Sequence, residues 1–271
     1  MIESNFETVA HFVDERPGRG MARLRAAGPP AIFLIAILVI WQLACTYFEV
    51  PDFILPAPSQ IVTTLVVDWQ DPLASATFVT LQEVVIGFIM ALVTALLIAA
   101  ALHMSVTARR AVYPLLIGSQ TIPIVVIGPI LAIIFGYTIL PKVILVTLIC
   151  FFPIVVTTID GLASVDPQLT RMMRTLYGTR WSIFRRIEFP AALPSMFSGI
   201  RVAATYASIG AVFGEYAGST DGLGYVMILA TPMLQTSLVF AAIALLSLIS
   251  ICLFLIVTLA ERILVPWAKV K

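Results

Sequence analysis

The stretch that decides the fold is residues 160–194, which read DGLASVDPQLTRMMRTLYGTRWSIFRRIEFPAALP. It carries five arginines, whereas the segments on both sides of it are apolar enough to lie in a lipid bilayer. Asp166 can cap a helix, and Pro167 suits the first helical position because its missing N–H would have no partner there. The stretch therefore predicts a short helical excursion out of the membrane between two membrane-spanning helices.

The first helix of this stretch is predicted to be amphipathic. Four apolar side chains recur at the spacing i, i+3, i+4 and i+7, which places them on one face: Leu169, Met172, Met173 and Leu176. Arg171 and Arg174 lie on another face. Gly178 is predicted to end this helix in a left-handed cap. A second helical turn, residues 180–187, is predicted to end before Pro190, because the residue before a proline avoids the helical region.

A stripe of Met and Leu side chains beside a membrane has two interpretations. The stripe inserts into a groove on a partner protein, since Met side chains adapt to irregular apolar surfaces. Alternatively, the helix lies on the lipid headgroups as a surface helix. The pattern alone favours neither interpretation.

The composition identifies an integral membrane protein of the all-α class. Hydrophobic residues make up 60% of the chain and charged residues 11%, against about 25% charged residues in soluble domains. The net charge of +1 gives no electrostatic basis for binding nucleic acid. The three cysteines and two histidines have no spacing typical of a disulfide framework or a metal site. The sequence also lacks a G-x-x-x-x-G-K-[ST] loop, so we expect no enzymatic activity and no cofactor.

Hydropathy divides the chain into an N-terminal tail, residues 1–28, and a transmembrane domain, residues 29–271. Since a span needs roughly 20 apolar residues, six spans are predicted: residues 31–48, 81–102, 112–135, 142–159, 195–213 and 238–260. A short amphipathic helix is expected at residues 61–67, between the first two spans. The third span is predicted to be irregular because it contains three prolines.

The basic residues predict the orientation of these spans. Fourteen of the 16 Lys and Arg residues fall on one side if six spans alternate. The positive-inside rule then places both termini and residues 160–194 in the cytoplasm. The two exceptions are Lys142, at an opposite-side end, and Arg201, which is expected to extend to the cytoplasmic headgroups.

Two polar features within the apolar part are candidates for a solute path. Gln120 and Thr121 stand just before Pro123, which is expected to kink the span and free a backbone carbonyl. Polar side chains beside an opened backbone suit a solute path, although they also suit hydrogen bonds to a neighbouring helix.

The second feature is the glycine-rich stretch at residues 213–225, which contains four glycines and a carboxylate. Glycine permits close backbone approach, so this stretch can re-enter the membrane or form a constriction. Its candidate path or gate residues are Glu215, Tyr216, Ser219, Gly222 and Gly224. The alternative for Glu215 is a position in water at the end of a span, because a carboxylate deeper in the membrane needs a partner.

Residues 160–194 resemble the coupling loop of ABC importer permeases of the type I, binding-protein-dependent kind. That loop has the pattern Glu-Ala-Ala-x-x-x-Gly, followed by a segment that ends in Ile-x-Leu-Pro. Gly178 holds the glycine position, residues 187–190 hold the closing position, and Pro194 with residues 199–202 continues the match. Met172, Met173 and Arg174 stand where Glu-Ala-Ala is usual, so this sequence departs from the signature itself.

The resemblance extends over nearly the whole chain after the tail. Residues 53–59, 122–129, 135–136 and 214–224 resemble the subgroup that moves nitrate, taurine, alkanesulfonates and pyrimidine precursors of thiamine. Gly214-Glu215-Tyr216 with residues 234–236 is most similar to the pyrimidine-precursor or riboflavin-type members. The solutes implied are a pyrimidine thiamine precursor, a riboflavin-like compound or a sulfonate.

The resemblance implies a permease of the prokaryotic plasma (inner) membrane that hydrolyses no ATP itself. Its partners would be ABC ATPase subunits, an extracytoplasmic solute-binding protein, a second permease copy and membrane lipid. The residues implied to contact the ATPase are Leu169, Met172, Met173, Arg174, Leu176, Tyr177 and Gly178. The alternative function is an ion-coupled secondary transporter or channel, which would need paired intramembrane charges, and the sequence displays few.

Overall fold

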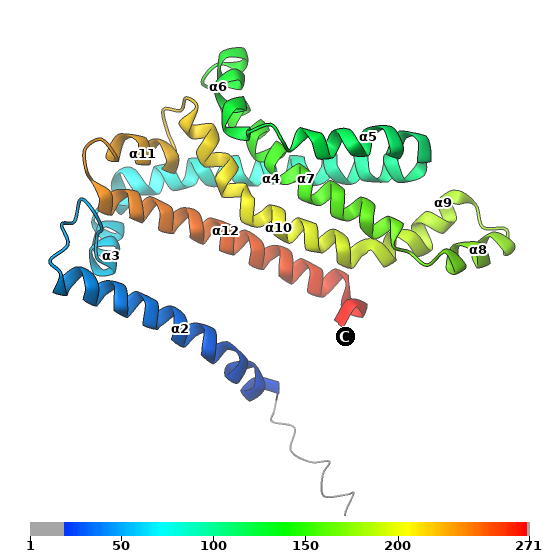
Figure 1. The fold of residues 1–271 in the computed structure, drawn as a ribbon, viewed down its shortest axis with the longest axis horizontal. Helices are drawn as coiled ribbons and strands as arrows, with labels where there is room; N and C mark the ends of the chain where they lie inside the picture. Colours follow the sequence, from blue (N-terminus) through cyan, green and yellow to red (C-terminus); the bar gives the residue numbers. More distant parts are fainter. Residues whose placement is uncertain (1–18, 270–271) are drawn as a thin grey trace, which may run out of the picture. The chain divides into compact units, whose positions relative to one another are not determined.

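The computed structural model describes residues 19–269, and every regular element among them is a helix (Figure 1). This architecture confirms the predicted all-α class. The chain divides into two compact units, Met1–Gln60 and Ile61–Lys271, and each is described by itself. The predicted tail, residues 1–28, falls partly outside the described residues.

The first unit consists of helix α2 (Arg19–Tyr47) and the connection that follows it. The apolar part of α2 is Ala31–Tyr47, which matches the first predicted span. The connection folds back on the end of α2, since the Ser59 N–H donates to Gln42 Oε1 at 3.0 Å and Cys45 Sγ donates to the Leu55 carbonyl at 3.7 Å. The expected short helix is α3 (Pro58–Val67), within which the boundary between the units falls.

Four long apolar helices build the second unit. They are α4 (Ala74–Met104), which follows the helical turn η2 (Trp69–Leu73), then α7 (Ile139–Ala163), α10 (Phe189–Tyr216) and α12 (Thr236–Leu264). These helices contain the second, fourth, fifth and sixth predicted spans. Each helix extends beyond both predicted limits of its span.

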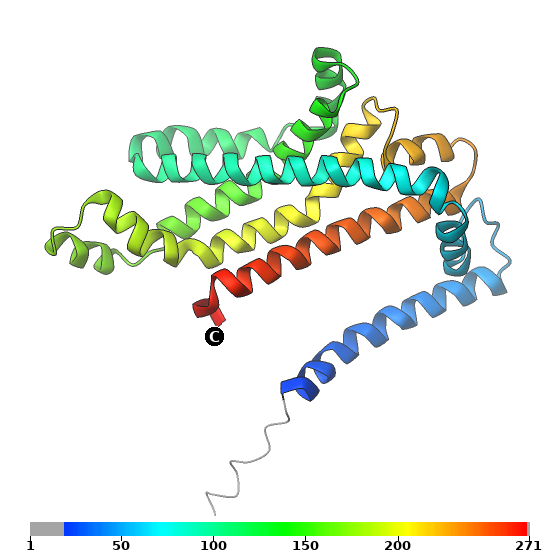
Figure 2. The same cartoon turned by 180° about the vertical axis from the view of Figure 1, so that it is seen from behind.

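Helices α7 and α10 form the centre of this unit, with α4 packed on α7 and α12 packed on α10 (Figures 1 and 2). Glycines bring α7 and α10 into backbone contact. A Cβ atom on Gly210 would lie 2.8 Å from Val146 Cα, and one on Gly214 would lie 2.8 Å from Lys142 Cα. Small residues permit such an approach between apolar helices, and it holds Lys142 beside the end of α10.

The third predicted span is two helices, α5 (Val106–Ser119) and α6 (Ile124–Phe135), bent by 95° at the break between them. The break coincides with Pro123, whose ring has no N–H to continue the helical hydrogen bonds. Residues 19–269 contain four helices long and apolar enough to cross a membrane, or up to five if the bent pair is one span. The count of six stays a prediction, because the apolar part of α2 falls in a shorter class.

The polar stretch forms α8 (Pro167–Thr175), α9 (Arg180–Ile183) and the π-helical turn η3 (Phe184–Glu188). The predicted stop before Pro190 is wrong, since η3 leads directly into α10 and one helical run extends from Arg180 to Tyr216 over 37 residues. A π turn changes the backbone register, which accommodates the proline at the start of α10.

The second unit therefore has two ends, which we name by their short helices. The α8 end carries α8, α9 and the end of α12, where the turn η4 (Pro266–Lys269) follows. The α11 end carries α11 (Leu223–Ala230) and the starts of α4 and α12 (Figure 2).

Candidate functional site

The glycine-rich stretch closes the α11 end of the second unit. Gly218 and Gly222 have positive φ angles of 146° and 111°, a region that favours glycine. These two residues turn the chain from α10 into α11. The turn brings the first residues of α11 back against Glu215, one residue before the end of α10.

The Glu215 carboxylate is fully buried and binds the N-terminus of α11. Glu215 Oε2 accepts a hydrogen bond from the Gly224 N–H, and Glu215 Oε1 accepts one from the Thr80 hydroxyl of α4 at 2.6 Å. Thr80 Oγ1 in turn accepts from the Leu223 N–H at 2.9 Å. Two N–H groups that would lack partners at a helix N-terminus are thereby satisfied by a carboxylate and a hydroxyl.

Gly224 allows this carboxylate to approach the backbone. A Cβ atom on Gly224 would lie 2.7 Å from Glu215 Oε2, which is closer than real contacts permit. Glu215, Gly222 and Gly224 are thus brought together, and the constriction itself stays a prediction. Glu215 does not face water at the end of a span, because its side chain has no exposed surface. Tyr216 and Ser219 lie nearer the surface, where the Ser219 hydroxyl donates to the Asp221 carbonyl at 2.5 Å.

A buried ion pair lies beside Glu215. Lys142 Nζ of α7 donates to Glu83 Oε1 of α4 at 2.7 Å, and their side chains are 8% and 0% exposed. Glu83 Oε2 accepts no hydrogen bond from the described residues, and the Glu215 carboxylate is close enough to interact with it electrostatically. Two carboxylates and one ammonium thus share the interior of the α11 end.

Sequence reasoning missed this pair. Glu83 and Lys142 lie near the predicted starts of their spans, which made both resemble end residues facing water. The available signal was the presence of an ionisable side chain within an apolar helix, which marks a functional position by default. Arg201 was likewise not expected to have a protein partner, yet Arg201 Nη1 donates to Glu261 Oε2 of α12 at 2.6 Å.

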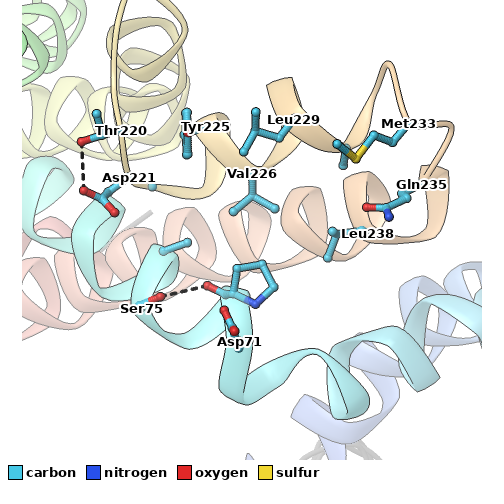
Figure 3. A pocket seen from close by; sticks show the side chains of 14 residues that line it. Asp71, Ser75, Thr220, Asp221, Tyr225, Val226, Leu229, Met233, Gln235 and Leu238 are labelled. Atoms are coloured by element: carbon cyan, nitrogen blue, oxygen red, sulfur yellow. Dashed lines mark hydrogen bonds between the residues drawn. The ribbon is translucent and has the colours of Figure 1, made fainter.

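A cavity of about 440 Å³ opens at the α11 end, between η2 with the start of α4 and α11 with the start of α12 (Figure 3). Asp71 and Ser75 line one side, and Tyr225, Val226 and Leu229 face them from α11 (Figure 3). Further lining residues are Asp221, Gly222, Met233, Gln235 and Leu238. The volume suits a small organic molecule, and the lining combines an apolar body with two carboxylates that accept hydrogen bonds.

The other predicted path residues lie at the bend between α5 and α6. Gln120 and Thr121 are exposed there, and the Thr121 hydroxyl donates to the Gly118 carbonyl at 2.8 Å. Pro123 is the N-cap residue of α6. Helix α6 packs near the end of α10, since a Cβ atom on Gly128 would lie 2.8 Å from Ala217 Cβ. No hydrogen bond among residues 19–269 joins the bend directly to Glu215.

Helix α8 at the opposite end has the predicted start. Asp166 is its N-cap and accepts a hydrogen bond from the Gln168 N–H at 2.7 Å, and Pro167 follows at the first position. The predicted apolar face is largely uncovered, because Leu169, Met172 and Leu176 are 46%, 57% and 66% exposed. Met173 is partly exposed, and Arg174 is exposed.

The end of α8 differs from the prediction. The left-handed residue is Tyr177, with φ of 58°, and not Gly178. The Gly178 N–H donates to the Met173 carbonyl at 2.9 Å and the Tyr177 N–H to the Arg174 carbonyl at 3.1 Å, which is the Schellman arrangement. Glycine is needed at residue 178 for space, because a Cβ atom there would lie 2.7 Å from the Met173 carbonyl oxygen. The side chain of Tyr177 is consequently 97% exposed.

A buried carboxylate also anchors the α8 end. Glu188 of η3 accepts hydrogen bonds from His103 Nε2 of α4 at 2.8 Å and from Arg180 Nη1 of α9 at 2.9 Å. Arg180 Nη2 additionally donates to the His103 carbonyl at 3.3 Å. The run from α9 to α10 is therefore bound to α4 at both of its ends, by Glu188 here and by Glu215 at the α11 end. Within the described part of the chain, no group of three or more His, Cys, Asp or Glu is placed to hold a metal ion.

Comparison with protein families gives a match to the model described as binding-protein-dependent transport system inner membrane component, over residues 83–270. The formylaminopyrimidine transport permease protein ThiX of Halalkalibacterium halodurans is 36% identical, over 92% of this chain and 99% of that protein. The riboflavin transport system permease protein RibX of Chloroflexus aurantiacus is 35% identical, over 89% of this chain and 90% of that protein.

A more distant relative is the putative aliphatic sulfonates transport permease protein SsuC of Bacillus subtilis, 29% identical over 96% of this chain and 94% of that protein. Among solved structures, an inward-facing conformation of the MetNI methionine ABC transporter contains a chain that matches with a TM-score of 0.57 and 17% identity. The match covers 69% of this chain and 95% of that chain, and it supports the fold.

Replacing one member of the Glu83–Lys142 pair is expected to lower the stability of the protein more than replacing both. Lys142→Met leaves two buried carboxylates without their cation, and removing one partner of a buried pair costs about 3–5 kcal/mol. The double variant Glu83→Leu/Lys142→Met replaces the pair by apolar side chains, which is often neutral. We expect the thermal unfolding midpoint in detergent to fall for Lys142→Met and to recover in the double variant. Equal midpoints for the wild type and Lys142→Met would contradict a buried pair.

Proposed function

Because this chain belongs to the family of binding-protein-dependent transport system inner membrane components, and is the permease subunit of an ABC importer, we propose that its solute is a pyrimidine thiamine precursor or a riboflavin-like compound. The permease is a multi-pass inner-membrane protein, and ATP hydrolysis takes place on partner ATPase subunits. The observation that carries the proposal is the cavity of about 440 Å³ at the α11 end, together with the two relatives that cover about nine-tenths of the chain.

The charge of that cavity favours one class of solute over another. The carboxylates of Asp71 and Asp221 accept hydrogen bonds, which suits the amino and ring N–H groups of an aminopyrimidine or a flavin. The same carboxylates repel a sulfonate, because like charges at short range disfavour binding. Tyr225, Val226 and Leu229 offer the apolar and aromatic surface on which a flat heterocycle packs. Sulfonates are therefore the less favoured of the expected solutes.

We assign the contact with the ATPase to α8. Its exposed stripe, Leu169, Met172, Met173 and Leu176, would insert into a groove on an ATPase subunit, as amphipathic helices do. Arg174, Tyr177 and Gly178 complete the contact, since the Schellman turn projects the Tyr177 side chain away from the protein. The Met172-Met173-Arg174 segment supplies apolar volume and a cation at this surface in place of a carboxylate.

Movement of α8 would reach the α11 end through one helical run. The run from Arg180 to Tyr216 starts two residues after Gly178 and ends one residue after Glu215. Glu188 and Glu215 bind it to α4 near both ends, so a shift of this run either carries α4 with it or breaks a buried hydrogen bond. Displacement of Glu215 would then move the N-terminus of α11, which forms a wall of the cavity.

The path itself would form between two copies of the permease. Gln120, Thr121 and Pro123 would line it at the α5–α6 bend, and Glu215, Tyr216, Ser219, Gly222 and Gly224 would form the gate. Both termini and α8 would face the cytoplasm, as the distribution of Lys and Arg predicts. The α11 end would then face outward and receive solute from an extracytoplasmic binding protein.

Solute uptake tests the proposed function. We expect the permease, purified with its ATPase and reconstituted with its binding protein, to accumulate radiolabelled formylaminopyrimidine or riboflavin in proteoliposomes only when ATP is supplied. An alkanesulfonate is the matched anionic control and should be excluded. Preferred uptake of the sulfonate would contradict the proposed solute class, whereas uptake driven by an ion gradient without ATP would favour the secondary transporter.

Charge insertion tests the role of α8. Met172→Asp or Leu176→Asp places a carboxylate in the apolar stripe, and burying it in a groove costs several kcal/mol. We expect ATP-driven uptake to fall by about tenfold or more, with loss of ATPase copurification. Gln168→Asp is the control, because this residue is exposed in the first turn, where a carboxylate is favourable. Equal losses for control and stripe variants would exclude the groove contact.

Two further variants test the gate and the bend. Glu215→Gln keeps the size of the side chain but leaves one acceptor for the Thr80 and Gly224 donors, and an unsatisfied donor costs about 1–3 kcal/mol. Gln120→Ala removes the amide at the bend. We expect both variants to assemble with the ATPase and to take up solute more slowly, whereas Gln82→Ala, exposed on α4, should not. Unchanged uptake rates in both variants would restrict these residues to structural roles.

A further inference from the structure

A second cavity, of about 500 Å³, opens at the α8 end between the end of α4, the first turns of α5 and the start of α9. Three of its lining side chains are guanidinium groups, from Arg109, Arg110 and Arg180. Helices α4 and α5, which carry His103 and the first two arginines, lie side by side in both views of the fold (Figures 1 and 2). The proposed transport function assigns no role to this cavity.

The charges that face the cavity are unbalanced. Arg180 is paired with Glu188 and therefore held in place. Arg109 and Arg110 form no salt bridge within 4.0 Å with any carboxylate of residues 19–269. The neighbouring acid is Asp160, which accepts a hydrogen bond from the Tyr113 hydroxyl at 3.3 Å. Three guanidinium groups thus face two carboxylates, of which one is already occupied by Arg180 and His103.

The position of Arg109 and Arg110 near the start of α5 adds to this excess of positive charge. Helix α5 has no acidic residue in its first turn, and Arg109 and Arg110 follow its first three residues. The N-terminus of a helix carries partial positive charge, which adds to that of the two arginines just beyond its first turn. Three guanidinium groups around a cavity of this size suit a phosphate group, because arginine forms strong charge-assisted hydrogen bonds with phosphate.

The surroundings identify the source of the phosphate. Val106, which lines the cavity, is 66% exposed, and Met104 and Leu115, which are next in sequence to the lining residues His103 and Pro114, are 42% and 71% exposed. A soluble phosphate gains no binding energy from apolar neighbours. A phospholipid does, because its acyl chains pack against them while its headgroup lies among the arginines. Basic pockets between membrane helices bind anionic headgroups in this manner.

We propose that this cavity binds the phosphate headgroup of an anionic membrane lipid. Arg109 and Arg110 donate directly to the phosphate, and Arg180, oriented by Glu188, closes the site from α9. A lipid bound here joins α4 and α5 to α9 at the end of the protein that carries α8. The site is formed by the permease chain alone and needs neither ATP nor solute.

Lipid binding to the full chain in detergent micelles tests the proposal. Native mass spectrometry with phosphatidylglycerol, phosphatidylcholine and inorganic phosphate separates the headgroup charge from a soluble anion. We expect phosphatidylglycerol to bind at least about tenfold more tightly than phosphatidylcholine, and Arg109→Gln/Arg110→Gln to remove that preference. Displacement of the lipid by an equal concentration of inorganic phosphate would overturn the assignment to lipid.

The matched control is Arg185→Gln/Arg186→Gln. These two arginines are exposed on η3 at the same end, and their replacement removes the same charge without touching the cavity. We expect this variant to keep the preference for phosphatidylglycerol. An equal loss in both double variants would overturn the proposal, because net charge alone would then explain binding. Loss of lipid binding on addition of the ATPase would also overturn it, by assigning the cavity to that interface. Arg110→Gln alone changes one exposed residue, and it serves as the test variant if the double variant does not fold.

Discussion

Carboxylates inside an apolar bundle have to be paired, and this constraint organises the second unit. Among residues 19–269, two of the three buried glutamates belong to the helical run from Arg180 to Tyr216, one near each end. Glu188 binds His103 and Glu215 binds Thr80, so both are satisfied by the same neighbour, α4. An unpaired buried carboxylate costs several kcal/mol. These two contacts therefore help to hold the two helices in register at both ends.

The helical run from Arg180 to Tyr216 therefore joins the α8 end to the α11 end. Sliding the run past α4 by one residue moves it by about 1.5 Å, which is enough to break a hydrogen bond of 2.6–2.8 Å at either end. Small displacements are consequently resisted, and larger ones have to be concerted with α4. The run from Arg180 to Tyr216 is thus one continuous helical element bound to α4 near both ends, whereas the α5–α6 pair is interrupted by its 95° break.

Much of this architecture could be predicted from the sequence, because the apolar spans and the Asp166–Pro167 start of α8 depend on local chemistry alone. The left-handed residue at the end of α8 could not, since Tyr177 takes that conformation while Gly178 supplies space for the Met173 carbonyl. The helix through Pro190 depends on a π turn that has no simple sequence signature. Glu83 and Lys142 lie 59 residues apart in the sequence. Their pairing depends on the rotation of two helices relative to each other, which the periodicity within one helix does not reveal. The assignments of α8 to the ATPase and of the bend to the path stay predictions.

The buried charges at the α11 end also bear on the choice between ATP-driven and ion-coupled transport. An ion-coupled mechanism needs carboxylate oxygens that exchange their partners with an ion. Lys142 occupies one oxygen of Glu83, and the donors Thr80 and Gly224 occupy both oxygens of Glu215. These bonds connect α4, α7, α10 and the N-terminus of α11. The cluster is therefore bound to the elements that would move in the proposed transport mechanism. Because Leu223 and Gly224 contact the cluster while Tyr225 and Val226 line the cavity, one short helix links the buried charges to the solute-sized space. In the proposed mechanism, a force applied along α10 from the α8 end would change the shape of that space without any ion entering it.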